Sequence, residues 1–363
     1  MLNRTRVTNW LVALSVAATV FAVVPAGASN AAPRTNSLYV ALGDSYSSGE
    51  GLVPFIAGSG SCDRSTQGYP ALVAHALRTL TLRFVACSGA TSAQISAQVG
   101  TVSKKQWRQT ALATVSAGGN DLPFSGLISA CIGATTKSAT PLFFYNPGVN
   151  SSIDCLAAVT SAAQLLGGAL TTTNDALTIP SAALTLPLRQ PSTIETRLRA
   201  LYLKIMRAQG VVLHRAKGPR LVVVTYPSLL ATSGAGACVL SPTPLPIAGP
   251  PGTDGLPQSL LAAFTSPASY LLSDLNTYLQ LETSIVVAQL RSEGYLGLSL
   301  ARATSFAPLD CSTGTSPDLN GLLLASTATT SSGGSFHPTS AGQSLLASSV
   351  EAAWRASVGR ATN

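Results

Sequence analysis

The sequence predicts an α/β fold in which a mostly parallel sheet is covered by helices on both faces. Two patterns support this fold: short apolar runs that stop at glycine or polar residues, and intervening segments with apolar residues at helical spacing. Strands that alternate with helices are typical of βαβ units, whose strands are parallel. With 363 residues, of which 46% are hydrophobic, the chain has ample material for a core.

Five strands are expected, and the first three end in small or polar residues. The first run contains Tyr39 and Val40 and stops at Gly43, and the clearest run is LVVVT. Residues 122–191 follow no regular period and are expected to form an insertion. The predicted strands are residues 38–42, 82–86, 111–116, 221–225 and 296–300, and the predicted helices are residues 69–80, 194–209, 270–292 and 340–354.

The first 28 residues have the features of a secretory signal peptide. Arg4 and Arg6 precede an apolar stretch at residues 10–24, and Ala26-Gly27-Ala28 suits cleavage. The alternative, an uncleaved anchor, is disfavoured because the stretch is shorter than the ~20 residues that span a bilayer. We therefore expect a secreted protein with a linker at residues 29–36 and one domain at residues 37–360.

The charge pattern argues against a nucleic-acid partner. Charged residues make up only 10% of the chain, and although the net charge is +8, the basic residues are scattered and no nucleic-acid motif accompanies them. Six cysteines in an exported chain favour disulfides over a zinc site, since no pair has C-x-x-C spacing. We expect no metal and no cofactor, and a monomer.

The segment GDSYSSG places Ser45 just after the first strand, in a turn bounded by glycines. A nucleophile benefits from this position because its hydroxyl stands clear of the sheet and N–H groups of the turn can face a developing oxyanion. The alternative is an ordinary helix-capping serine.

Four short segments occur in a fixed order along the chain: GDSYSSG, CSGAT, GGND and FHP. Together they resemble the conserved blocks of the SGNH (GDSL) hydrolase superfamily, and with six cysteines the chain is similar to its secreted actinomycete lipase and esterase branch. This resemblance covers nearly all of the chain after the signal peptide. It implies a flavodoxin-like, three-layer fold with strand order 2-1-3-4-5.

The resemblance also implies the site residues. Ser45 is the nucleophile, His337 is the general base and acid, and the oxyanion hole consists of Ser45, Gly89 and Asn120. The chemistry agrees, because glycine lets a backbone N–H approach closely and an asparagine amide donates without ionising. Strand order 2-1-3 brings three of these residues to the carboxyl ends of adjacent strands.

The position three residues before His337 is Gly334, where an acidic residue is the commoner pattern. The resemblance implies a Ser-His dyad in which a backbone carbonyl orients the imidazole, and we expect this carbonyl to be that of Gly334. Asp310 and Asp318 remain alternatives as third members. The resemblance further implies sequential disulfides, Cys62–Cys87, Cys131–Cys155 and Cys238–Cys311, although six cysteines allow 15 pairings.

The substrate is expected to be a carboxylic ester, with acyl lipids preferred and transient contact with a lipid surface left open. Apolar residues follow Asn120 and fit an acyl groove, but they fit equally a small core within the insertion. Phospholipase, carbohydrate deacetylase and acyltransferase use the same site chemistry, and a secreted binding protein with a dead site is the alternative of another class. The apolar residues are Leu122, Phe124, Leu127, Ile128 and residues 142–145.

Overall fold

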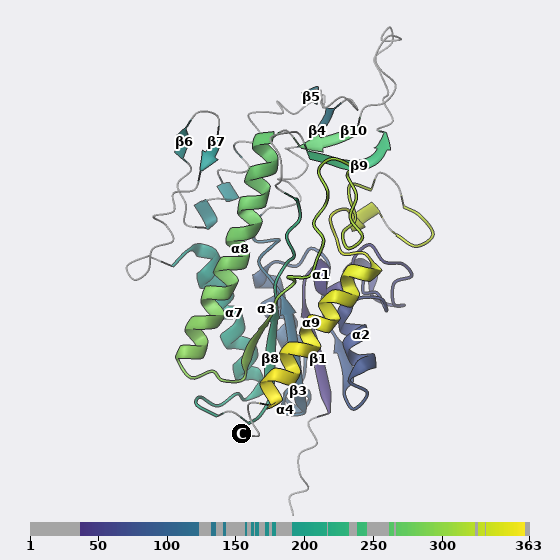
Figure 1. The fold of residues 1–363 in the computed structure, drawn as a ribbon. Coiled ribbons are helices and arrows are strands. Elements are labelled where there is room, and N and C mark those ends of the chain that lie inside the picture. The colour runs from purple at the N-terminus through teal and green to yellow at the C-terminus, as the bar shows by residue number, and fades with distance from the viewer. Residues whose placement is uncertain are drawn as a thin grey trace, which may run out of the picture. The chain divides into compact units, whose positions relative to one another are not determined.

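Five parallel strands form the central sheet of the computed structural model, in the order β11-β8-β3-β1-β2 (Figure 1). Strands β2 and β3 flank β1, which is the order 2-1-3-4-5 that the family resemblance implies, so the predicted α/β fold is confirmed. Both ends of each predicted strand lie within two residues of the ends of an observed strand. The strands are β1 (Leu38–Gly43), β2 (Thr81–Phe84), β3 (Thr110–Ser116), β8 (Arg220–Val224) and β11 (Leu298–Ala301).

The structure describes residues 37–122, 191–231 and 266–359, apart from residues 216, 324–325 and 331. It also describes residues 238–244 and 261–264 and short segments between residues 132 and 178. Residues 35–363 form one compact unit. The predicted signal peptide lies outside the described residues.

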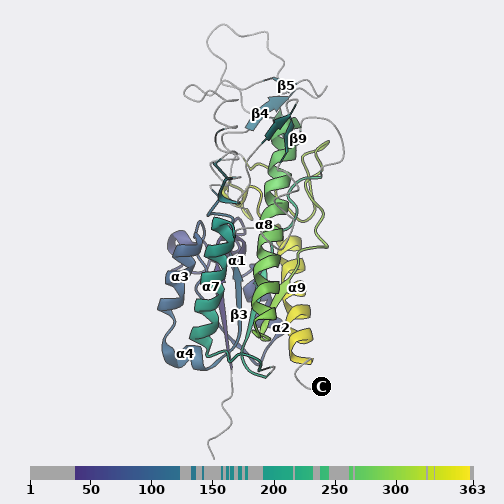
Figure 2. The same cartoon turned by 90° about the vertical axis from the view of Figure 1, so that its left-hand side faces the viewer.

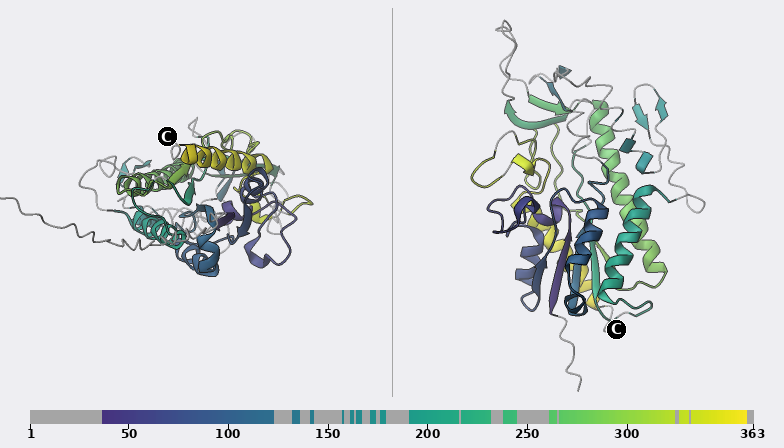
Figure 3. Two further views of the ribbon diagram at one scale, coloured as in Figure 1. Left: turned by 90° about the horizontal axis from the view of Figure 1, so that it is seen from below. Right: turned by 180° about the vertical axis from the view of Figure 1, so that it is seen from behind.

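Helices cover both faces of the sheet, as the continuous burial of its central strands requires. Helices α3 and α7 pack together on one face, while α2 and α9 pack on the other (Figure 2). The end-on view shows α9 in yellow and α7 in teal on opposite sides of the strands (Figure 3). The helices are α1 (Ser45–Ser48), α2 (Tyr69–Ala76), α3 (Ser92–Thr101), α4 (Lys104–Arg108), α7 (Thr193–Gln209), α8 (Ser266–Ser292) and α9 (Ser340–Gly359).

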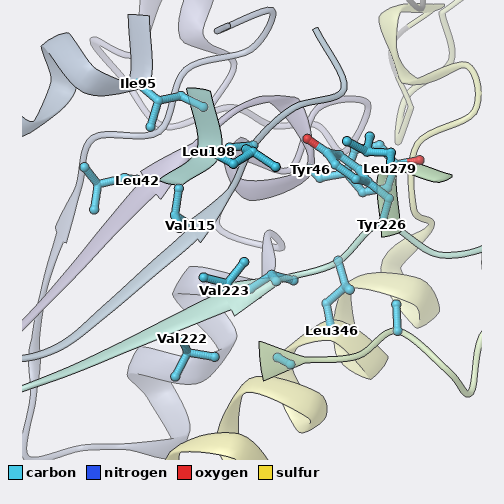
Figure 4. Packing of buried hydrophobic residues seen from close by; sticks show 14 of the residues in the cluster. Leu42, Tyr46, Ile95, Val115, Leu198, Val222, Val223, Tyr226, Leu279 and Leu346 are labelled. Atoms are coloured by element: carbon cyan, nitrogen blue, oxygen red, sulfur yellow. The ribbon is translucent and has the colours of Figure 1, made fainter. Parts of the chain in front are cut away.

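The core lies between these layers, and the sequence pattern explains its composition. Every residue of β3 and β8 is buried, because helices cover the sheet on both sides. Helix α7 buries Ile194, Leu198 and Ile205 at helical spacing, and the Ser192 hydroxyl caps its first turn. Figure 4 shows residues of this cluster from the strands, such as Leu42 and Val223, and from the helices around them, such as Leu198 of α7.

Parts of the fold were not predicted. Helices α3 and α4 have weakly apolar sequences, and both begin with a capping box, at Thr91 and Ser103. A small antiparallel sheet has the order β5-β4-β10-β9, and β6 pairs with β7 in a separate ladder. Four of these strands lie inside the predicted insertion, residues 122–191, where the sequence shows no regular period. The strands are β4 (Ile132–Thr135), β5 (Pro141–Leu142), β6 (Thr171–Thr173), β7 (Ala176–Thr178), β9 (Cys238–Pro244) and β10 (Leu261–Phe264).

Pairing between β4 and β10 joins segments more than 100 residues apart in the chain. Pairing between such distant segments leaves no local sequence pattern, so this sheet was not predicted. Among the helices that the structure describes, none combines the length and apolar character needed to cross a bilayer.

Candidate active site

Ser45 is the first residue of α1, directly beyond the end of β1. Asp44 caps the helix, since its Oδ1 accepts a hydrogen bond of 3.1 Å from the backbone N–H of Tyr46. The Ser45 side chain is 9% exposed. Neither its hydroxyl nor its backbone N–H is hydrogen-bonded to another described residue, His337 included, so both groups are available to a ligand.

Gly89 lies in the turn after β2. Its φ of +72° is a left-handed conformation that favours glycine, and a side chain built there would meet open space. A disulfide between Cys62 and Cys87 fixes the preceding residues, and Ser88 N–H donates to the Cys62 carbonyl at 3.2 Å. Gly89 N–H donates to no described acceptor, which leaves it free for a ligand.

Asn120 follows β3 in a tight turn. Its amide nitrogen donates to the Ala90 carbonyl at 3.3 Å, which links the Asn120 turn to the residue after Gly89. The next residue, Asp121, accepts hydrogen bonds from the backbone and the hydroxyl of Ser92 at 2.8 and 2.7 Å. These contacts tie the turn to the start of α3.

Strand register brings these turns to one edge of the sheet. Gly43 at the end of β1 pairs with Ser116 at the end of β3, and Ala41 pairs with Phe84 at the end of β2. The carboxyl ends of three adjacent strands therefore carry Ser45, Gly89 and Asn120, at the switch point where open α/β sheets bind ligands. The structure thus brings together the three residues that the sequence motifs singled out.

His337 lies on a loop that begins after β11, and its ring is oriented by a different carbonyl from the one expected. The Ser335 carbonyl lies 2.9 Å from His337 Nδ1. The Gly334 carbonyl instead ends a 3₁₀ turn (Ser332–Gly334), where it accepts from the backbone N–H of His337 at 3.0 Å and from the amide of Asn320 at 3.2 Å. The assignment to Gly334 was therefore wrong, because that carbonyl closes the turn.

The two aspartates considered as third members contact other groups. Asp318 Oδ2 accepts a 2.7 Å hydrogen bond from Ala307 N–H, and Asp310 Oδ1 accepts from the backbone and hydroxyl of Ser312. Among the described residues, neither carboxylate is hydrogen-bonded to His337. A backbone carbonyl is therefore the group that fixes the imidazole.

The His337 loop packs tightly against the residues around Ser45. Gly51 and Gly334 touch through their backbones, and a Cβ on Gly51 would lie 2.5 Å from the Gly334 Cα. The rings of Tyr46 and His337 have centroids 5.2 Å apart. Phe336 adopts a φ of +61°, which is strained for a bulky residue and places the next residue, His337, against Tyr46.

The environment of His337 sets its protonation. Burial lowers the pKa of His337 below its ordinary value, and the Ser335 carbonyl and the charge of Asp44 oppose this shift. A lowered pKa keeps the imidazole neutral near pH 7, which is the state that accepts a proton.

Asp44 is fully buried next to Ser45. Its Oδ1 accepts from Ser116 Oγ at 2.6 Å as well as from Tyr46 N–H, and its Oδ2 accepts from the Tyr226 hydroxyl. Burial raises the pKa of Asp44, and the three hydrogen bonds and His337 oppose the shift. These contacts give Asp44 a structural role, in which it joins α1 to β3 and to Tyr226.

Gln98 of α3 holds the end of β1 through two hydrogen bonds, and no sequence motif pointed to it. Its amide oxygen accepts from Gly43 N–H at 3.0 Å, and its amide nitrogen donates to the Gly43 carbonyl at 2.9 Å. A buried glutamine on an otherwise apolar helix face was the available signal, since buried amides are hydrogen-bonded.

A groove of about 700 Å³ begins at Asn120 and runs between α3 and α7. Three basic side chains line it, those of Arg197, Lys204 and Arg207. Asp121 forms a 3.2 Å ion pair with Arg197, so the lining keeps an excess of positive charge. An anionic group bound beside Asn120 would find favourable charge there.

Other predicted features lie apart from the site or outside the described residues. Leu122 is buried in the main core and so does not line an acyl groove. The described part of the chain contains the Cys238–Cys311 disulfide in addition to Cys62–Cys87. The following predictions fall outside the described residues: Phe124, Leu127, Ile128, residues 143–145 and the Cys131–Cys155 bridge.

Several known proteins are similar to this chain in sequence. The model of the GDSL-like Lipase/Acylhydrolase family matches residues 41–258. Lipase 1 of Streptomyces coelicolor is 40% identical over 132 residues, which are 36% of this chain and 48% of that protein. A lipase of Streptomyces rimosus is 41% identical over 111 residues, 30% of this chain and 40% of that protein. The matched part thus spans about half the length of these relatives or less.

Solved structures share the fold. The extracellular lipase of Streptomyces rimosus superposes with a TM-score of 0.56 at 22% identity, covering 87% of this chain and 99% of that one. Phospholipase A1 of Streptomyces albidoflavus gives a TM-score of 0.57 at 23% identity with the same coverage. The central sheet and its covering helices are therefore those of a known fold.

Proposed function

The chain belongs to the GDSL-like lipase/acylhydrolase family, and from this membership and the site geometry we propose that it is a serine hydrolase of carboxylic esters. The main support is that Ser45, Gly89 and Asn120 lie at one edge of the sheet. Among the described residues, the backbone N–H groups of Ser45 and Gly89 have no acceptor, so they are free to bind an oxyanion. Acyl lipids are the preferred substrates.

Acylation begins when Ser45 Oγ attacks the ester carbonyl while His337 Nε2 takes its proton. The negative charge that develops on the carbonyl oxygen accepts hydrogen bonds from Ser45 N–H, Gly89 N–H and the Asn120 amide. Collapse of the tetrahedral intermediate expels the alcohol, which takes the proton from His337. Water, deprotonated by His337, then attacks the acyl-enzyme, and the second tetrahedral intermediate releases the carboxylic acid while His337 returns the proton to Ser45 Oγ.

The Ser335 carbonyl orients the imidazole of the proposed dyad of Ser45 and His337. It accepts a hydrogen bond from the N–H at His337 Nδ1, so Nε2 stays unprotonated and can act as the base. Hydrogen bonds between nucleophile and base are often long without substrate and tighten on binding, which fits the unbonded Ser45 hydroxyl.

Secretion is part of the proposal. The predicted signal peptide and the two disulfides suit an oxidising compartment. The relative from Streptomyces rimosus whose structure is known is an extracellular lipase, which agrees with the same location.

The experiment that tests the proposed activity uses p-nitrophenyl esters of increasing acyl length with the mature protein. An optimum at long chains supports a lipase, and an optimum at acetyl supports a deacetylase. Transfer to an added alcohol supports an acyltransferase. A flat profile on every ester, identical to that of Ser45→Ala, contradicts hydrolase activity and favours a binding protein.

A second candidate function is phospholipase activity, which the basic groove beside Asn120 favours. A phosphate on the leaving group lies within a few bonds of the scissile ester, and Arg197 and Lys204 would meet it there. Phospholipase A1 activity of a protein with the same fold makes this class reasonable to test. Faster hydrolysis of phosphatidylglycerol than of the matching diacylglycerol supports it, and the reverse order contradicts it.

A further inference from the structure

We infer that Tyr226 is a positioning residue whose hydroxyl holds the nucleophile turn (residues 43–49) and the oxyanion loop (residues 117–121) in register. The inference rests on the function proposed above for Ser45 and Asn120. Tyr226 lies two residues beyond the last residue of β8, at the same edge of the sheet, and it is 7% exposed.

The Tyr226 hydroxyl bonds to both loops at once. It donates to Asp44 Oδ2, and it accepts a 3.0 Å hydrogen bond from Gly119 N–H. Asp44 immediately precedes Ser45, and Gly119 immediately precedes Asn120. One hydroxyl therefore links the residue before the nucleophile to the residue before the oxyanion-hole amide.

The Tyr226 ring also supports the general base. It packs against Tyr46 with ring centroids 5.0 Å apart and an interplanar angle of 83°, an edge-to-face arrangement (Figure 4). The Tyr46 ring in turn contacts that of His337. The Gly119 backbone lies directly on the phenol, since a Cβ at Gly119 would be 3.2 Å from Tyr226 Cζ and from the hydroxyl oxygen.

Removal of the hydroxyl would free these loops without emptying the core. Asp44 Oδ2 and Gly119 N–H would each lose this buried partner, and the peptide before Asn120 would be free to rotate. The oxyanion exists only after attack on the carbonyl, so a misdirected Asn120 amide weakens the transition state more than substrate binding. The expected signature is a lower kcat at constant KM.

The matched control is Tyr39→Phe. The Tyr39 side chain is fully buried in β1, and its hydroxyl shares a 2.8 Å hydrogen bond with Thr114 Oγ1. Among the described residues, this hydroxyl is hydrogen-bonded to neither loop, so Tyr39→Phe removes one buried phenol hydroxyl and leaves the link between the loops intact. Both variants are measured for kcat and KM on p-nitrophenyl butyrate, for the rate of fluorophosphonate labelling and for Tm.

Tyr226→Phe is expected to lower kcat and the labelling rate by about tenfold or more, with KM within about twofold of wild type. Tyr39→Phe is expected to keep both rates at the wild-type level. Its Tm is expected to fall by about as much as that of Tyr226→Phe. Equal kcat in the two variants, or a raised KM at unchanged kcat in Tyr226→Phe, overturns the inference. A wild-type protein that neither hydrolyses esters nor labels overturns the proposed function itself, and that result is visible before any variant is made.

Discussion

The hydroxyl of Tyr46 donates a hydrogen bond of 2.7 Å to the backbone carbonyl of Phe336. The residue after Ser45 is thus joined to the residue before His337, across 290 positions of sequence. This contact holds the strained Phe336 backbone and places the His337 loop over α1, so loop position depends on Tyr46.

We expect Tyr46→Phe to lower kcat while leaving the fold intact. One buried hydrogen bond contributes about 1 kcal/mol, so the His337 loop should sample other positions and kcat should fall several-fold. Steady-state kinetics with thermal unfolding test this. Unchanged kcat with a lowered Tm would show that the contact stabilises the fold without positioning His337.

Gly51→Ala should damage the same interface through the backbone. Gly51 has a φ of +91°, and its new Cβ would clash with the Gly334 Cα. We expect a loss of about 1–3 kcal/mol in the free energy of unfolding and a large loss of activity, since the His337 loop must move outward. Gly58→Ala is the control, because it also has positive φ but open space around it. Equal activities of the two variants would contradict the role of the glycine contact.

The pH dependence of kcat/KM should report the titration of His337. The imidazole acts as a base only when neutral, so activity rises as pH rises through its pKa. Burial lowers the pKa of His337 from the ordinary 6.5, and the midpoint of the acid limb on a soluble ester should lie below that value. A midpoint above 7 would contradict the assignment of His337 or its environment.

We expect removal of the two disulfides to have different effects on stability and on activity. Chain-entropy estimates give about 3.5 kcal/mol for closing the 25-residue Cys62–Cys87 separation and about 4.4 kcal/mol for the 73-residue Cys238–Cys311 separation. Replacing Cys238 and Cys311 by alanine should therefore lower Tm more. Replacing Cys62 and Cys87 should lower kcat more, because this bridge fixes the Gly89 turn. If one of the two replacements lowered both Tm and kcat more than the other did, the link between the Cys62–Cys87 bridge and the oxyanion hole would be contradicted.

The sequence predicted most of the central fold, and its motifs pointed to residues that the fold brings to one edge of the sheet. Strands such as residues 221–225 are buried on both faces, so their apolar runs are unambiguous, and the short motifs mark the ends of three strands. The order of the strands and the roles of Gly89 and Asn120 came from the family resemblance, since pairing of distant strands leaves no local signal.

The parts that escaped prediction depend on geometry at single atoms. Ser335 and Gly334 are adjacent, and only the 3₁₀ turn decides which carbonyl faces the imidazole. Tyr226 follows the fourth strand, so the strand-end reasoning that identified Ser45 could have found it as well. Its double hydrogen bond, however, joins residues 107 and 182 positions away.

Reaction of the mature protein with a fluorophosphonate, followed by peptide mass spectrometry, tests the central claim most directly. The account predicts a single adduct on Ser45, absent in Ser45→Ala and formed much more slowly in His337→Ala. A protein that hydrolyses esters yet carries the adduct on another residue, or carries none, would contradict it.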